Sequence, residues 1–446
     1  MGKNQMIASR PLTHFACYLF DQIISLCGLV LVAISQYDSD YILVMAILVW
    51  YIWLIFSILL GNKNWFFYAF WLLLTAYSST AWLLEKYIGI WPTNYFKVNV
   101  TTIFDGTKLC LEGIFISYMI VNLINLAIFP KLNKLNKKFA AVDGGKVLFA
   151  SIILFAIGFA DWITISKVGL NILLSEPRQA FRPFILSVNY RVTPVTLPCA
   201  ILLVAMLILQ RQKLWKSMVA MIALFTYWTP FLLIGSRREL IYLVFIGLWL
   251  ASSRERARKK DLILGLTFMM VFYFAGFALR GNFGVESILE FALPQYNLFL
   301  LMDYPQLYHN VRSIYTFEKG FWLLLPKVVR PVDITGLGAI FQSEAHLQFG
   351  LAFHPMAEAF LMSQELALLF FVFLTIAIIL VTNLLATVDP AFGVVGFASL
   401  LQWGRSDFWT TVVFIIHSGI ILSILLMPLK HGVIHDKHYS NRSLTV

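Results

Sequence analysis

Long apolar stretches alternate with short polar ones along almost the whole chain. A transmembrane helix consumes about 20 mainly apolar residues, and a dozen stretches approach that length. They occupy residues 14–35, 41–60, 65–85, 110–130, 147–166, 193–210, 217–234, 239–253, 261–279, 356–384, 389–403 and 408–428. The pattern predicts an all-α polytopic membrane protein of about twelve transmembrane helices.

The composition narrows the class of protein further. Of the 446 residues, 60% are hydrophobic and only 13% are charged, and the mean hydropathy is +0.79. These values exclude a soluble protein and leave no room for an extramembrane catalytic domain of ordinary size. The net charge is +11, but no nucleic-acid-binding module accompanies it, so nucleic acid is not an expected partner. The cysteines lie in apolar stretches without the spacing of metal ligands, which predicts neither a disulfide framework nor a metal site: Cys17, Cys27, Cys110 and Cys199.

Basic residues assign the connecting segments to the two sides of the membrane. The segments 131–146 and 254–260 are the richest in lysine and arginine, and the positive-inside rule puts them in the cytoplasm with both termini. The connections that become external lie at 36–40, 86–109, 167–192, 235–238, 280–355 and 404–407. The cytoplasmic set then holds 13 Lys and 6 Arg and the external set 6 Lys and 9 Arg, together the 34 of the chain. Because guanidinium groups bind phosphate and carboxylate through two parallel hydrogen bonds, we expect the external surface to hold an anionic ligand; pairing with acids or lipid phosphates is the alternative.

Two external motifs concentrate these arginines. The turn GSRREL at 235–240 carries Arg237 and Arg238 just before a helix, whose free N–H groups favour a bound anion. The alternative is that both side chains only reach toward the membrane rim, with Glu239 as a counter-charge. The segment 176–191 carries three more among aromatic residues, which suits contact with sugar or phosphate, or else an interfacial helix: Arg178, Arg182 and Arg191.

The external segment 280–355 is the one long connection. Its aromatic and leucine residues predict short amphipathic helices folded against the membrane rim. We therefore divide the chain into helices one to nine at 1–279, this external loop, and helices ten to twelve with a cytoplasmic tail at 356–446. The arginines of the loop are further candidate ligands of a diphosphate or glycan: Arg280, Arg312 and Arg330.

His354 and Glu358 form the candidate catalytic pair. The sequence FHPMAEAF places the histidine just before a predicted helix and the glutamate four residues later, on the same helical face. A neutral imidazole near a carboxylate can take a proton from an alcohol, so His354 is the predicted general base and Glu358 orients its ring; a purely structural histidine is the alternative. Arg405 in the turn GRSDF faces the same external compartment, unless it only pairs with Asp407. We expect four arginines to line one cavity that holds the anionic ligand: Arg237, Arg238, Arg280 and Arg405.

The arrangement of these motifs resembles that of Wzy-type O-antigen or oligosaccharide repeat-unit polymerases. The resemblance rests on the GSRREL turn, the arginine-rich loop before it, the long late loop, the segment FHPMAEAFLMSQELALLF and the GRSDF turn. The chain is also similar to the O-antigen ligases, in which a histidine of the large periplasmic loop precedes a helix, and His354 matches that position. Pro355 follows this histidine and SQEL stands where the ligases have a glycine pair, so the chain departs from the ligase pattern there.

The resemblance implies a GT-C-like glycosyltransferase of the bacterial inner membrane, with its active site on the periplasmic side. The implied substrates are an undecaprenyl-diphosphate-linked oligosaccharide donor and a second lipid-linked repeat unit as acceptor. A chain-length regulator is a possible protein partner. Arginines would stabilise the departing diphosphate, so neither a metal nor a cofactor is implied.

Two other functions remain open. A polyprenyl-phosphate-sugar glycosyltransferase could use Asp38 and Asp40 as base or metal ligands, although acids in a short external turn are ordinary. A flippase or other transporter of lipid-linked oligosaccharides would show repeated halves, and broken helices with charges near the middle of the membrane. The sequence has no visible repeated halves.

Overall fold

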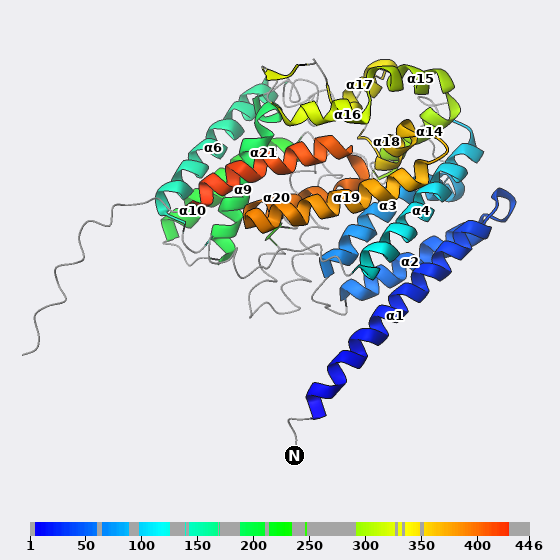
Figure 1. Ribbon diagram of the computed structural model, residues 1–446. Helices are drawn as coiled ribbons and strands as arrows, with labels where there is room; N and C mark the ends of the chain where they lie inside the picture. The colour runs from blue at the N-terminus through cyan, green and yellow to red at the C-terminus, as the bar shows by residue number, and fades with distance from the viewer. Residues whose placement is uncertain are drawn as a thin grey trace, which may run out of the picture.

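The computed structural model describes residues 5–59, 65–88, 98–124, 139, 142–167, 169, 188–209, 214–233, 246–247, 291–325, 329–331, 335–347 and 352–427. Within these ranges all regular structure is helical (Figure 1). Six of the described helices are long and apolar enough to cross a membrane: Tyr41–Leu59, Phe66–Ile88, Val100–Leu123, Gly144–Ser166, Ala367–Val388 and Phe408–Leu426. The chain is therefore an all-α membrane protein, as the apolar pattern predicts.

The first four helices pack together, as the blue and cyan ribbons of Figure 1 show: α1 (Gln5–Ile34), α2 (Tyr41–Leu59), α3 (Trp65–Ile88) and α4 (Val100–Leu123). Their interior is aromatic, with the Trp50 ring 4.8 Å from that of Phe115 and 4.9 Å from that of Tyr118, centroid to centroid. The two edge-to-face contacts suit the ring quadrupoles. Lys108 of α4 donates to the Ala33 and Ser35 carbonyl oxygens, each at 3.0 Å, and so satisfies the free carbonyl groups at the end of α1.

A second group of helices comprises α6 (Gly144–Ser166), α9 (Val188–Leu209) and α10 (Leu214–Leu233). In this group α6 packs against both of the others. Gly158 lets α6 approach the backbone of α10, since a Cβ atom at this position would lie 2.6 Å from the Thr226 carbonyl oxygen. One turn further on, Trp162 Nε1 donates to Thr229 Oγ1 at 3.2 Å. The approach at Gly158 therefore sets the spacing of the α6–α10 pair.

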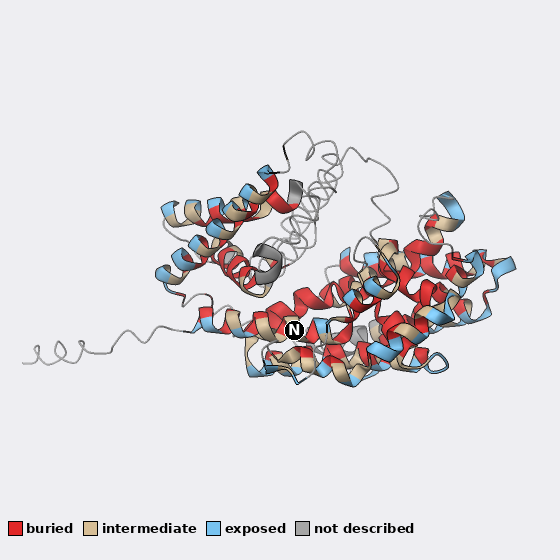
Figure 2. Cartoon of the chain, turned by 90° about the horizontal axis from the view of Figure 1, so that it is seen from above, coloured by how far each residue is buried: buried red, intermediate tan, exposed pale blue. Residues whose placement is uncertain are grey.

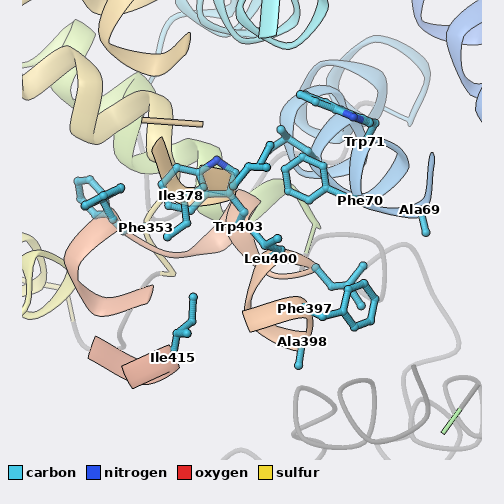
Figure 3. Packing of buried hydrophobic residues seen from close by; sticks show 14 of the residues in the cluster. Ala69, Phe70, Trp71, Phe353, Ile378, Phe397, Ala398, Leu400, Trp403 and Ile415 are labelled. Atoms are coloured by element: carbon cyan, nitrogen blue, oxygen red, sulfur yellow. The ribbon is translucent and has the colours of Figure 1, made fainter. Parts of the chain in front are cut away.

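The C-terminal helices connect these two groups. They are α18 (Pro355–Met362), α19 (Ala367–Val388), α20 (Pro390–Leu400) and α21 (Phe408–Leu426), with the short helix η5 (Trp403–Arg405) before α21. α19 packs against α4, and α21 packs against α9. Figure 3 shows Trp403 together with other members of the buried core, among them Phe70, Ile378 and Leu400. η5 is thus part of the core rather than an exposed turn.

The outward surface of the helices is apolar. Figure 2 shows buried residues where helices face one another and exposed residues on their outer sides. Large hydrophobic side chains are among the exposed ones, with Ile52 at 67%, Phe225 at 68% and Leu384 at 66%. Such a surface suits lipid rather than water, which agrees with the assignment to a membrane.

Short helices from the segment 291–347 cover one end of α3 and α4. They are η2 (Leu293–Gln295), α14 (Tyr296–Asp303), α15 (Pro305–Ile314), α16 (Phe317–Gly320), η3 (Phe321–Leu324) and α17 (Leu337–Glu344). We call this segment the cap. Asp303 at the end of α14 accepts hydrogen bonds from Asn99 N, at 2.6 Å, and from Thr102 Oγ1. The cap thereby binds the first turn of α4.

Four predicted spans differ from the structure. The span expected at 14–35 is α1, which already begins at Gln5. The span expected at 110–130 is α4, which begins at Val100 because Asp303 stabilises its polar first turn. The span expected at 356–384 is broken at 363–366, where Ser363 is extended (φ −162°, ψ 126°) and its hydroxyl accepts from Leu366 N at 3.3 Å. The span expected at 389–403 contains the 11-residue α20, too short to cross alone, followed by a turn and η5. The spans expected at 239–253 and 261–279 lie outside the described residues, apart from 246–247.

The close approach at Gly158 yields a stability prediction. Gly158→Val should lower the melting temperature of the protein in detergent, because overpacking a tight contact costs about 1–3 kcal/mol. Gly336→Ala is the matched control, since its added Cβ would meet Thr410 Oγ1 at an ordinary 3.4 Å. Equal melting temperatures for the two variants would contradict the packing described for α6 and α10.

Candidate functional site

His354 lies at the start of α18, in the interior of the protein. It is the N-cap residue of this helix, and its side chain is 0% exposed. Its Nδ1 accepts from Met356 N at 3.1 Å, which leaves Nε2 as the nitrogen that carries the proton. Nε2 lies 3.0 Å from Ser78 Oγ and donates to it. Both ring nitrogens are therefore occupied by partners within the protein.

The position of His354 is interior, whereas the sequence predicts an external loop. Ser78 lies near the middle of α3, and Cys110, whose Sγ is 4.0 Å from the histidine Nδ1, lies near the middle of α4. The imidazole is fully buried between α3 and α4, and its ring stacks on Phe371 of α19. Burial lowers the pKa of His354 to about 3. This geometry favours a neutral, structural imidazole over a general base.

Glu358 binds groups other than His354. Its Oε1 accepts from the Tyr315 hydroxyl at 3.2 Å, and its Oε2 accepts from Phe408 N at 2.7 Å. Tyr315 directly follows α15 of the cap, and Phe408 is the first residue of α21. The carboxylate, 0% exposed, thus joins α18 to the cap and to the last helix. The sequence predicts that Glu358 orients the imidazole ring. In the structure, the carboxylate instead accepts hydrogen bonds from Tyr315 and Phe408.

A second buried carboxylate lies next to Glu358. Asp407 is the N-cap residue of α21, 4% exposed, and its Oδ1 accepts from Thr410 N at 2.8 Å. Burial raises the pKa of Asp407. The pKa of Glu358 is raised well above its usual value, first by burial and then by the negative charge of Asp407. Two buried acids that repel one another favour retention of a proton as the pH rises.

Two of the candidate arginines lie on elements that pack against α18. Arg312 on α15 donates to the Tyr308 hydroxyl, and its guanidinium carbon is 5.6 Å from the centre of that ring. Arg405 lies on η5 and is half-buried. Both α15 and η5 contact α18. The two arginines therefore lie on elements that contact the helix carrying Glu358.

Arg330 has a different environment from the one its sequence context predicts. Its Nε donates to the Leu325 carbonyl oxygen at 2.7 Å, and its NH2 group donates to that of Leu323 at 3.3 Å. These bonds satisfy the carbonyl groups at the end of η3. Arg330 thus has a role in holding the chain, and its role in binding a diphosphate stays a prediction.

The remaining candidate arginines cannot be placed at this site. Arg191 lies in the first turns of α9, and its side chain is outside the described part of the chain. The others also lie outside the described residues: Arg178, Arg182, Arg237, Arg238 and Arg280. Of the four arginines expected to line one cavity, the structure describes only Arg405. That expectation therefore stays a prediction.

Ser78 and Tyr315 are site residues that the sequence did not single out. A serine within an apolar span and a tyrosine after an amphipathic helix are both ordinary, so no local pattern marks them. Among the described residues, no group of three or more His, Cys, Asp or Glu side chains could hold a metal ion. The chemistry available in this part of the chain is that of carboxylates, hydroxyls and guanidinium groups.

No family model, no curated protein and no solved structure matches this chain. The class that the fold defines is an all-α integral membrane protein with a capped helix bundle and a buried acidic junction between α18 and α21.

The buried imidazole yields a prediction about stability and pH. In the unfolded chain a histidine takes up a proton near pH 6.5, whereas His354 in the native protein does so near pH 3. Between these values the unfolded state binds more protons, so the contribution of His354 is present above pH 6.5 and is lost as the pH falls, by up to about 1.4 kcal/mol per pH unit.

The melting temperature of wild type should accordingly fall more steeply between pH 6.5 and pH 4.5 than that of His354→Asn. The control is His309→Asn, which alters an exposed histidine on α15 and should keep the wild-type slope. A His354→Asn slope as steep as that of wild type would show that the imidazole is not held neutral.

Proposed function

We propose that this protein is an integral-membrane glycosyltransferase that polymerises undecaprenyl-diphosphate-linked oligosaccharide repeat units. One observation carries the proposal: the cap, η5 and the start of α21 meet on α18, with Arg312 and Arg405 on the elements that flank this helix. Guanidinium groups beside a lipid-facing helix bundle suit a ligand with an anionic diphosphate and an apolar tail.

The reaction proposed here is attack of an acceptor sugar hydroxyl on the anomeric carbon of the donor. A glycosidic bond forms, the bond from this carbon to the diphosphate breaks, and undecaprenyl diphosphate leaves. The arginine charges stabilise the negative charge that develops on the leaving group, and a diphosphate oxygen can receive the proton of the hydroxyl. No protein base is required for this balance.

The buried residues then have positioning roles. His354 fixes the start of α18, and Glu358 fixes Phe408, three residues after Arg405. The base role that the resemblance to the ligases implies for His354 requires a free ring nitrogen, and both nitrogens have partners. Charge stabilisation by arginine is the source of catalysis that this geometry favours.

The proposal includes the finer topology. Twelve spans with cytoplasmic termini would put the cap, Arg312 and Arg405 on the external side, in a GT-C-like arrangement. In a bacterial inner membrane this side is the periplasm. The proposed partners are the lipid-linked donor and acceptor, membrane lipid and a chain-length regulator.

The test is reconstitution of the purified protein in liposomes with a labelled lipid-linked repeat unit. We expect a ladder of products that differ by one repeat unit, formed without added metal or cofactor. Absence of any product longer than the substrate, with a protein that melts cooperatively, would reject the polymerase function.

A transporter of lipid-linked oligosaccharides is the second candidate function. The observation that favours it is the break between α18 and α19 together with the buried acids Glu358 and Asp407, because discontinuous helices and enclosed charges are typical of transporters. In the same liposomes a transporter would move a fluorescent lipid-linked oligosaccharide to the other leaflet without lengthening it.

The acid-dependent glycosyltransferase that uses Asp38 and Asp40 has less support. Asp40 is 8% exposed and forms an ion pair with Lys86 at the end of α3, and Asp38 lies in the short helix η1 (Tyr37–Ser39). The Asp40 carboxylate therefore has a structural partner. Full polymerisation by Asp38→Asn and Asp40→Asn would exclude this function.

A further inference from the structure

The segment Phe317–Leu325 lies along the side of α21 rather than above its end. Trp409 Nε1 donates to the Phe317 carbonyl oxygen at 2.7 Å, and His417 Nε2 donates to that of Leu324 at 3.2 Å. The two donors are eight residues apart on α21, which is about 12 Å along the helix axis. α16 and η3 thus follow the first half of α21, as Figure 1 shows for α16.

The far end of this segment reaches the middle of α21. Counted from Phe408 and from Leu426, His417 is the central residue of the 19-residue helix. A helix of this length spans about 28 Å, close to the roughly 30 Å of the hydrocarbon core. When α21 crosses the membrane, the carbonyl group bonded to His417 therefore lies within the hydrocarbon.

The side chains of the segment fit such a position. Phe321 on η3 is 50% exposed and also packs edge-to-face on Trp409, with ring centroids 5.7 Å apart. Glu318 and Lys319 are at the end nearer the start of α21, where the membrane surface would be. Within Phe317–Leu325 itself, the charged side chains are thus confined to the end nearer the start of α21.

The backbone of the segment is satisfied by cationic or polar side chains. The carbonyl oxygens of Leu323 and Leu325 accept from Arg330, and that of Leu324 accepts from His417. Non-helical backbone at membrane depth is tolerated only where its polar groups have partners inside the protein. An arginine and a histidine on three successive carbonyl groups meet this requirement.

We propose that Phe317–Leu325 is a re-entrant segment that enters the bilayer beside α21 and contacts lipid chains through Phe321. Arg330 and His417 hold it there by satisfying its carbonyl groups. This role is independent of the proposed enzymatic function, because it depends only on α21 spanning the membrane. The partner of the surface is the bilayer itself.

The depth of a spin label at position 321 tests the proposal. Phe321→Cys and, as a matched control in the same cap, Gln306→Cys on the exposed side of α15 are labelled with a nitroxide. The background has the four native cysteines replaced by alanine, and the liposomes are of phosphatidylglycerol and phosphatidylcholine. We expect oxygen to relax the label at 321 several-fold more than a water-soluble nickel chelate does, with the reverse order at 306. Equal access of the chelate to both positions would overturn the proposal.

A second measurement tests the holding residues. Arg330→Met and His417→Leu each remove a side chain that donates to carbonyl groups of Phe317–Leu325. Access of the nickel chelate to a label at 321 should therefore rise in both variants. The control is Lys319→Ala, which removes a cation from the same segment without removing a donor from the carbonyl groups of residues 323–325. Unchanged access in both Arg330→Met and His417→Leu would overturn the assigned role of these two side chains.

Discussion

Glu358→Ala should destabilise the protein by about 2–6 kcal/mol. The change removes the acceptor of both the Tyr315 hydroxyl and the Phe408 N–H, and each buried donor left without a partner costs about 1–3 kcal/mol. Thermal unfolding of the purified protein in detergent measures the effect. The loss should appear as a lower melting temperature, because α18 is no longer joined to the cap and to α21 by this carboxylate.

Two variants make this result specific. Glu358→Gln keeps an oxygen for Phe408 N and should retain most of the stability. Glu365→Ala alters an exposed glutamate in the break between α18 and α19 and should melt as wild type does. If Glu358→Ala had the same melting temperature as Glu365→Ala, the Glu358 carboxylate would not join α18 to α21, which would contradict its positioning role.

Arg405→Ala should reduce the rate of polymer formation by about 10² to 10³-fold, the range seen when one preorganised donor to a developing negative charge is removed. Arg405→Lys should also be impaired, since an ammonium group keeps the charge but loses the planar fork. The rate is measured with labelled lipid-linked repeat units in liposomes, at a temperature where all variants are folded.

The control for Arg405 is Lys319→Ala, which removes a cation from the cap but alters no group assigned to the substrate. Its polymerisation rate should equal that of wild type. Wild-type rates for Arg405→Ala would mean that the anion site lies elsewhere, with the arginines of the 176–191 and 235–240 segments as the next candidates.

The apolar pattern was sufficient to find the long helices. The spans expected at 41–60, 147–166 and 408–428 match α2, α6 and α21 to within three residues at either end. Each is a continuous apolar run whose length already equals the membrane thickness. The twelve-span count itself stays a prediction, because parts of the chain that carry it lie outside the described residues.

Contacts between distant segments explain what the pattern could not give. The start of α4 depends on Asp303, some two hundred positions later, so the hydrophobic pattern alone predicts a loop for its polar first turn. The break at 363–366 has apolar residues on both sides, and it begins at Ser363, whose backbone is extended. Hydrophobic periodicity contains neither piece of information.

The candidate site shows the same limit. His354 precedes α18 directly and Glu358 lies on this helix, as the sequence predicts, but the spacing of the two residues could not determine their partners. Ser78 on α3 and Phe408 on α21 decide what each side chain does, and both come from other helices. The sequence likewise could not separate Arg405 beside α18 from Arg330, whose guanidinium group is bonded to backbone carbonyl groups.

The most direct measurement of the central claim is transfer of a labelled repeat unit in liposomes by three proteins side by side: wild type, Glu358→Gln and Arg405→Ala. The account predicts a product ladder from wild type and from Glu358→Gln, whose junction is intact, and almost none from Arg405→Ala. A ladder from Arg405→Ala equal to that of wild type, or movement of the lipid-linked substrate across the bilayer by wild type without any lengthening, would contradict it.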